Sequence, residues 1–247
     1  MIIERKKHFF IDADTPMVYH NIDQRYTMNK NELYNELKLK IFDEDISPGT
    51  WLVERELCDQ YSLSRTPVRE ILRVLVSDGL ITLEPTKGYT VRKLSFEEII
   101  EIFHAREGVE GMAARLSCLR GDQDFLALVE KIKNQLVEID INKDTYLGVE
   151  TGHKLHNALI KAAGNKILDE FYKKLNNLAA LTRNLSKRSV EIERNSRNDH
   201  IAISKAILEK DEEKCEHAMR RHIKNTCLLL TQSYLMEQTC LVSNLNA

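Results

Sequence analysis

A long helical segment without proline is the feature that most constrains the fold of this chain. Only four prolines and nine glycines occur among its 247 residues. From Ser95 to about Tyr234, amphipathic helical patterns follow one another, and no strand signal interrupts them. Because proline and glycine are the strongest local breakers of helices, the sequence predicts a mainly α fold whose second part is all-helical.

The first part of the chain carries a different pattern, of three helices followed by a small β-hairpin. Apolar periodicity predicts helices over residues 29–42, 55–61 and 65–77. Two short strands are expected at residues 80–83 and 89–91, where apolar and β-branched residues flank a turn-forming segment. Three helices and a hairpin in this order make a winged helix-turn-helix.

Capping residues mark where these segments end. Ser64 is a favourable N-cap for the third helix, and Gly79 is expected in a left-handed conformation just after it. Ser95 and Glu98 have the spacing of a capping box, which starts the first helix of the second part. The expected domains are an N-terminal arm, a winged domain and a helical domain, at residues 1–27, 28–94 and 95–240.

Basic residues gather in the expected helix-turn-helix, although the chain as a whole has a net charge of −2. Between Ser64 and Lys93, six basic residues stand against three acidic ones, a local net charge of +3. Arg65, Arg69 and Arg73 fall on the solvent side of the third helix, where a guanidinium group can grip a phosphate or read a guanine. The pattern alone leaves two interpretations open, a DNA-binding surface and a merely solvated helix face.

A resemblance decides between these two interpretations. The segments Glu54–Leu57, Ser64–Glu70 and Asp78–Ile81 read EREL, SRTPVRE and DGLI, and they resemble the signature of the GntR family of bacterial transcription regulators. The similarity covers essentially all of residues 28–94. It implies that the operator DNA is contacted by Arg55, Ser64, Arg65, Thr66, Arg69 and the wing glycine Gly88. Lys87, beside Gly88 at the wing tip, is expected to contact the DNA as well.

The helical part is similar to the ligand-sensing FCD domain of the FadR-type branch of that family. Its landmarks are Arg106 and Glu110, the stretch His156–Asn165, Asp199-His200, and Met219–His222. The resemblance implies an antiparallel bundle of six or seven helices, a pocket among them for a small carboxylate effector, and a homodimer.

Many members of this branch bind a divalent metal through an aspartate and three histidines. The resemblance assigns the imidazoles to His156, His200 and His222, which suit Zn²⁺, Ni²⁺ or a similar ion and leave positions for an effector. The aspartate is expected four residues before the first histidine, where this chain has Gly152. His153 is the nearest alternative ligand on that helix.

Other roles for these residues remain open from the sequence. Histidines on apolar helix faces are commonly hydrogen-bonded core residues, and the three have no metal-ligand spacing of their own. A site without metal, where the histidines hold an effector anion directly, is also consistent with the pattern. Arg106 is expected to pair with an effector carboxylate, or else with Glu107 or Glu110 in a structural ion pair.

Composition excludes several classes of protein. Five scattered cysteines without CxxC spacing indicate reduced thiols rather than a disulfide framework. No apolar run approaches the roughly 18 residues that a transmembrane helix needs, and the N-terminal residues lack the features of a signal peptide. The chain is therefore expected to be cytoplasmic, without a membrane partner.

The predicted function is that of a DNA-binding transcription regulator, a repressor rather than an enzyme. A small acidic metabolite in the helical domain, together with a divalent metal, is expected to control its affinity for double-stranded operator DNA. Two rival hypotheses are a metal hydrolase built on the three histidines and a helical adaptor for other proteins. The sequence offers no HExxH motif or clear general base for the first, and salt-insensitive binding would mark the second.

Overall fold

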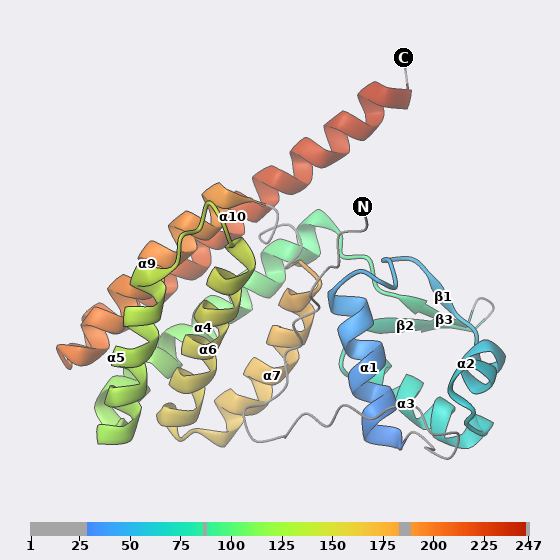
Figure 1. The fold of residues 1–247 in the computed structure, drawn as a ribbon, viewed down its shortest axis with the longest axis horizontal. Helices are drawn as coiled ribbons and strands as arrows, with labels where there is room; N and C mark the ends of the chain where they lie inside the picture. The colour runs from blue at the N-terminus through green and yellow to red at the C-terminus, as the bar shows by residue number, and fades with distance from the viewer. Residues whose placement is uncertain (1–28, 86–87, 183–188, 246–247) are drawn as a thin grey trace. The chain divides into compact units, whose positions relative to one another are not determined.

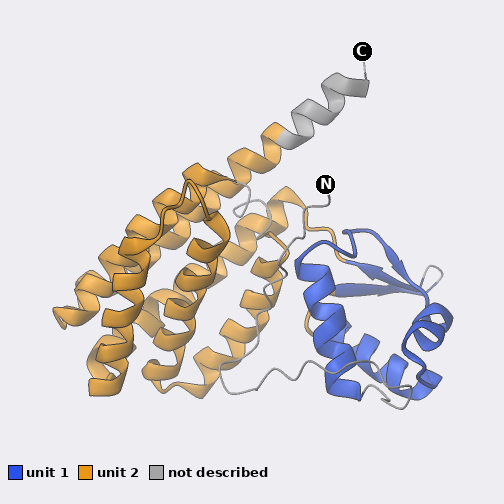
Figure 2. Ribbon diagram, viewed as in Figure 1, with its two compact units in different colours: residues 1–77, 81–91 blue, residues 78–80, 92–247 orange. Residues whose placement is uncertain are grey.

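The computed structural model describes residues 29–85, 88–182 and 189–245, with side chains as far as residue 236. The expected N-terminal arm at residues 1–27 lies outside this part of the chain. The described residues divide into two compact units (Figure 2). Unit 1 contains the residues up to Ser77 together with Ile81–Val91, and unit 2 contains Asp78–Leu80 and the residues from Arg92 onward.

Unit 1 is the winged helix-turn-helix that the sequence predicts. Its helices are α1 (Lys30–Phe42), α2 (Glu54–Tyr61) and α3 (Arg65–Ser77), and its strands are β1 (Trp51–Leu52), β2 (Ile81–Glu84) and β3 (Gly88–Val91). The apolar stripes of the three helices pack together with residues from the sheet. This core buries Leu33, Leu37, Ile41, Leu57, Val68, Ile71, Leu72, Leu75, Ile81 and Val91.

The sheet of unit 1 contains the expected hairpin and one strand that was not expected. It has three antiparallel strands in the order β1-β3-β2 (Figure 1). Trp51 and Leu52 pair with Thr90 and Tyr89 across the ladder. A strand of two residues is too short to show an alternating pattern, which is why periodicity missed it. The hairpin strands themselves lie one residue from their expected positions.

Unit 2 is a bundle of helices, with no strand among its described residues. Its helices are α4 (Phe96–Arg120), α5 (Gln123–Glu138), α6 (Thr145–Ala163), α7 (Lys166–Ala180), α9 (Val190–Leu208) and α10 (Glu212–Leu245). In this bundle α10 packs along α4 and α9, and α6 packs against both α4 and α9 (Figure 1). No helix in the described part of the chain combines the length and apolar character needed to cross a bilayer.

Local signals set the ends of these helices as expected. Ser95 caps α4, because its hydroxyl accepts the Glu98 N–H at 3.1 Å while the Glu98 carboxylate accepts the Ser95 N–H at 2.8 Å. Gly79 has φ +75°, the left-handed conformation predicted after α3. α6 ends in the same way at Gly164, with φ +60°. The hydrophobic core of the bundle includes Phe103, Leu155, Leu159, Ile203 and Met219.

Candidate functional site

One face of α3 in unit 1 is free to meet a large partner. Val68, Ile71, Leu72 and Leu75 occupy its buried side. The opposite side exposes polar side chains that include those of Arg65, Thr66, Arg69 and Arg73, with Glu70 beside them. An exposed helix face with arginines at its N-terminal end has the chemistry needed for the major groove of DNA.

A short ion pair joins α2 to this face. Arg69 Nε donates to Glu54 Oε2 at 2.7 Å, and this carboxylate raises the pKa of Arg69 further. Arg55, the second residue of α2, is exposed and lies 3.8 Å from the Asp59 carboxylate. The ion pair thus links the first turn of α2 to α3.

In the wing, Gly88 is the described residue that is expected to contact DNA. Gly88 opens β3 with φ +79°, and a Cβ added there would meet no atom within 4 Å. A glycine backbone of this kind can approach a phosphate closely. Ser64 is exposed immediately before α3. Lys87, the other wing residue expected to contact DNA, lies outside the described residues.

Three imidazoles converge in unit 2, from three different helices. His156 comes from α6, His200 from α9 and His222 from α10, and each is at most 6% exposed. Their nearest ring nitrogens all lie within 4.8 Å of one another, and His156 Nε2 is 3.0 Å from His200 Nε2. Residues separated by 44 and 22 positions are thereby brought to one point. We call these three residues the histidine cluster.

A buried carboxylate orients the first member of the cluster. Glu110 of α4 is hydrogen-bonded to His156 Nδ1, and Arg106 Nε donates to its other oxygen at 2.6 Å. Burial by itself raises the pKa of Glu110, but Arg106 and His156 outweigh it and hold the pKa well below its usual value. Because an ionised carboxylate only accepts, His156 Nδ1 carries the proton and its Nε2 faces the cluster.

The two other histidines have nitrogens without a partner. Both His200 Nδ1 and His222 Nδ1 are buried and accept or donate no hydrogen bond. The carboxylate of Asp199 lies 3.8 Å from His222 Nδ1, which is too long for a hydrogen bond. Burial, with the neighbouring imidazoles, lowers the pKa of His200 well below its usual value. Burial also lowers the pKa of His222 to about 4, although Asp199 opposes the shift.

Gly152 has a steric role that the sequence does not reveal. A Cβ at this position would lie 2.3 Å from His200 Cε1 and 2.6 Å from its Nδ1. The His200 ring therefore occupies the space that a side chain of residue 152 would need. The absence of aspartate here is not a simple loss of a ligand, because the His200 imidazole occupies the space that an aspartate side chain would need.

A cavity of about 90 Å³ adjoins the cluster and exposes further polar groups. Its lining includes the histidine cluster with Arg106, His153, Asn176, Thr182, Glu193 and Ser196. His153 is half-buried there, but it does not join the close group of ligand atoms that the described residues form. Arg106 reaches the cavity while paired with Glu110, the structural partner that the sequence allowed.

Sequence reasoning did not find Glu193, which is 1% exposed in this cavity. Burial raises its pKa to about 8, and Arg197 only partly opposes the shift. Its Oε1 atom has no hydrogen-bond partner. The available signal was its position on α9, two helical turns before His200 and on the same face.

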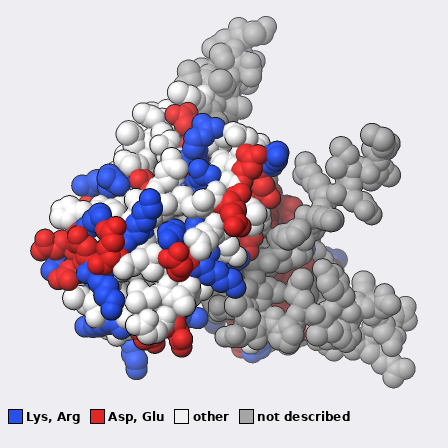
Figure 3. Space-filling model, turned by 60° about the vertical axis from the view of Figure 1, so that its left-hand side comes forward, with Lys and Arg blue, Asp and Glu red and all other residues white. Residues whose placement is uncertain are grey.

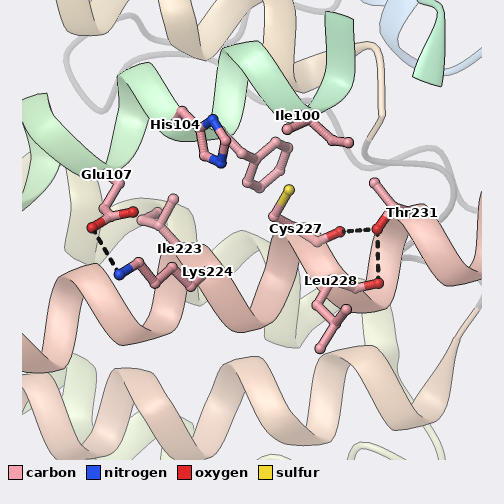
Figure 4. A pocket seen from close by; sticks show the side chains of 9 residues that line it. Ile100, His104, Glu107, Ile223, Lys224, Cys227, Leu228 and Thr231 are labelled. Atoms are coloured by element: carbon pink, nitrogen blue, oxygen red, sulfur yellow. Dashed lines mark hydrogen bonds and ion pairs between the residues drawn. The ribbon is translucent and has the colours of Figure 1, made fainter. Parts of the chain in front are cut away.

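A second cavity, of about 240 Å³, opens between α4 and α10 and is mainly apolar (Figure 4). Phe103, Ile223 and Cys227 line it, and Glu107 and Lys224 form an ion pair of 3.3 Å at one end. Across the described surface that Figure 3 brings forward, acidic and basic side chains are interspersed. That face therefore offers no broad field of one sign to a polyanion.

Comparisons with known proteins agree with the winged helix-turn-helix of unit 1 and with the helical bundle of unit 2. The pattern of the bacterial regulatory proteins of the gntR family matches residues 29–91, and that of the FCD domain matches residues 101–225. The chain is 27% identical over 215 residues to the transcriptional repressor GlaR of Escherichia coli, covering 84% of this chain and 98% of GlaR.

Two further proteins are also similar to most of this chain. The HTH-type transcriptional regulator YdhC of Bacillus subtilis is 25% identical over 198 residues, which cover 79% of this chain and 88% of YdhC. The solved structure of E. coli McbR/YncC superposes with a TM-score of 0.70 at 23% identity, covering 83% of this chain and 98% of McbR. These relatives are transcription regulators rather than enzymes. The chain therefore belongs to the GntR family, as a DNA-binding transcription regulator of the FadR-type branch with an FCD domain.

Proposed function

We propose that this regulator is a homodimeric, cytoplasmic repressor whose operator affinity is set by the histidine cluster and the cavity beside it. Residues 28–94 act as the DNA-binding domain, and residues 95–240 act as the sensor and dimerisation domain. The observation that carries the proposal is the convergence of three buried imidazoles with nitrogens within 4.8 Å. The name of GlaR, a repressor, supports the sign of regulation.

The cluster has the donor set of a divalent-metal site. Two of its buried ring nitrogens have no partner, and burial keeps two of its rings neutral near pH 7, the form that binds metals. Glu110 fixes the orientation of His156 through its Nδ1, as carboxylates do behind metal-bound histidines. A bound Zn²⁺ or similar ion would supply a positive charge for an effector carboxylate.

The residues around the cluster suit a small acidic effector. Arg106 lines the same cavity as the three histidines, and its guanidinium group can pair with a carboxylate. Glu110 holds this arginine in place and neutralises part of its charge. An effector that enters here contacts α4, α6, α9 and α10 at once, so its binding can change how these helices pack.

Regulation then follows from linkage between two sites. Arg55, Ser64, Arg65, Thr66, Arg69, Lys87 and Gly88 contact the operator, and two copies of α3 must fit half-sites at a fixed separation. An effector that binds one arrangement of the dimer more tightly shifts the population toward it. Operator affinity changes by the same factor as effector affinity.

Two measurements test the proposal. A duplex selected from a random library is titrated with wild-type protein and with Arg65→Ala; the variant is expected to bind about tenfold or more weakly, because a bidentate arginine contributes about 1–3 kcal/mol.

In the second measurement, Zn²⁺ is titrated into chelator-treated wild type, His200→Ala and His222→Ala by calorimetry. His217→Ala is the control, because His217 lies exposed on α10. Full DNA binding by Arg65→Ala, or equal Zn²⁺ binding by all four proteins, would overturn it.

A further inference from the structure

Glu193 is a buried acid that has no role in the effector site proposed above. It lies on α9, seven residues before His200, which corresponds to about 10 Å along the helix. Both side chains pack against glycines of α6. A Cβ at Gly148 would lie 2.5 Å from Glu193 Oε1, and a Cβ at Gly152 would collide with His200. The two glycines are one helical turn apart, so α6 makes room for both groups.

No described residue forms a hydrogen bond with the Oε1 atom of this carboxyl group. Glu193 is 1% exposed. Arg197, one turn further along α9, partly stabilises the ionised carboxylate, but its Nη1 donates to the Ile139 carbonyl at 2.9 Å and its buried Nε has no hydrogen-bond partner. A buried acid whose charge is only partly compensated is costly, and the cavity is where a further cation could enter.

Glu193 also stands apart from the histidine cluster. Its oxygens do not join the ligand atoms that lie within 4.8 Å of one another, so it is not placed to share a metal with them. The residues that line the cavity thus include groups of opposite character. Arg106 and the three imidazoles suit a carboxylate, and Glu193 suits a cation.

We propose that the effector carries a primary ammonium group, which binds Glu193 beside Gly148 while its carboxylate lies at the histidine cluster and Arg106. This inference rests on the proposed function, and it narrows the effector class from acids to amino acids with separated charges. Without ligand, burial raises the pKa of Glu193 to about 8, so the group is mostly neutral at pH 7. Ammonium binding favours the ionised form and releases a proton.

Matched pairs of ligands test the ammonium site directly. The probes are 4-aminobutanoate, 5-aminopentanoate and 6-aminohexanoate, compared by calorimetry with butanoate, pentanoate and hexanoate. The full chain is used as purified. For at least one pair, the amino compound is expected to bind about tenfold or more tightly than its partner, the range of a hydrogen bond to a charged group.

Two variants identify the residue responsible. Glu193→Gln keeps the size of the side chain and is expected to reduce the preference to less than about threefold, since a neutral amide attracts ammonium weakly. Glu193→Asp keeps the charge but withdraws it from the cavity, and should also weaken the preference. Arg197→Gln is the control, because it leaves the carboxylate available, and it should preserve the preference.

The possible results separate this inference from the function on which it rests. Equal binding of the two series, binding of neither, or a preference that persists in Glu193→Gln would overturn the ammonium site. In the last case Glu193 would be only the counter-ion of Arg197. The proposed function fails on a different result, an operator affinity that does not respond when the histidine cluster is changed or loaded with Zn²⁺.

Discussion

Gly152 and His200 occupy one space: a Cβ on the glycine would lie 2.3 Å from the imidazole Cε1. The glycine that takes the place of an expected aspartate on α6 is therefore what allows His200 of α9 to reach the cluster. The contact also explains how three histidines from three helices come so close. A side chain at residue 152 and the present position of His200 exclude each other.

Gly152→Ala is predicted to displace the His200 ring and weaken Zn²⁺ binding about tenfold or more, the usual effect of disturbing groups that orient a metal ligand. Calorimetric titration measures the change. Gly108→Ala is the matched control, because it is also a helical glycine and its added Cβ would meet no atom within 4 Å. Unchanged Zn²⁺ affinity in Gly152→Ala would show that the ring has room to move without cost.

Glu110→Gln is predicted to destabilise the protein by about 3–5 kcal/mol. The substitution removes a buried negative charge that lies between Arg106 and His156, and breaking a buried pair leaves the remaining charge uncompensated. Urea denaturation measures the loss. Glu130→Gln, which breaks the more exposed pair with Lys133, should cost about 1 kcal/mol or less; similar losses in both variants would contradict the assigned role of Glu110.

The free energy of unfolding is predicted to fall as pH rises, because of Glu193. Its pKa is raised from 4.5 to about 8 in the folded protein, so between these values the folded state binds more protons than the unfolded state. The stability linked to this proton is complete below pH 4.5 and is lost as pH rises toward 8, by at most about 1.4 kcal/mol per unit.

Denaturation of wild type and Glu193→Gln at pH 5, 6, 7 and 8 checks this linkage. The variant cannot ionise, so its stability should rise relative to wild type across the series. A constant difference between the two proteins would mean that Glu193 is ionised throughout, with Arg197 as its effective partner.

Glu54 is predicted to restrain DNA binding through Arg69. The carboxylate holds Arg69 Nε at 2.7 Å, and a phosphate or base must replace it in the complex. Glu54→Gln should therefore raise affinity for DNA severalfold and steepen its salt dependence. Glu56→Gln removes the same charge from the same helix, where Glu56 is exposed and Glu54 is the residue that pairs with Arg69. If both variants bind equally well, the effect is one of net charge alone.

The sequence predicted the elements up to the start of α4 well because their signals are local. The Ser95–Glu98 capping box, the left-handed Gly79 and the apolar stripe of α3 each depend on residues a few positions apart. β1 was missed because its two residues show no period and are defined by pairing with β3, about 38 positions away.

The site in unit 2 was predicted only in part, because its decisive contacts are between helices. Similarity to the FCD domain indicated His156, His200 and His222, but nothing near Gly152 in the chain shows that His200 fills its space. Glu193 alone resembles an ordinary solvated acid on a helix. Its burial depends on Gly148, which lies 45 positions earlier and has no side chain to keep α9 away.

The coupling between the histidine cluster and DNA is tested most directly by operator affinity with and without Zn²⁺. Fluorescence anisotropy would compare chelator-treated and Zn²⁺-loaded wild type with the same two states of His200→Ala. The account predicts a change in Kd of at least about fivefold for wild type, the lower range of allosteric coupling, and little change for the variant. Equal Kd values for the two wild-type states, or an equal shift in His200→Ala, would contradict it.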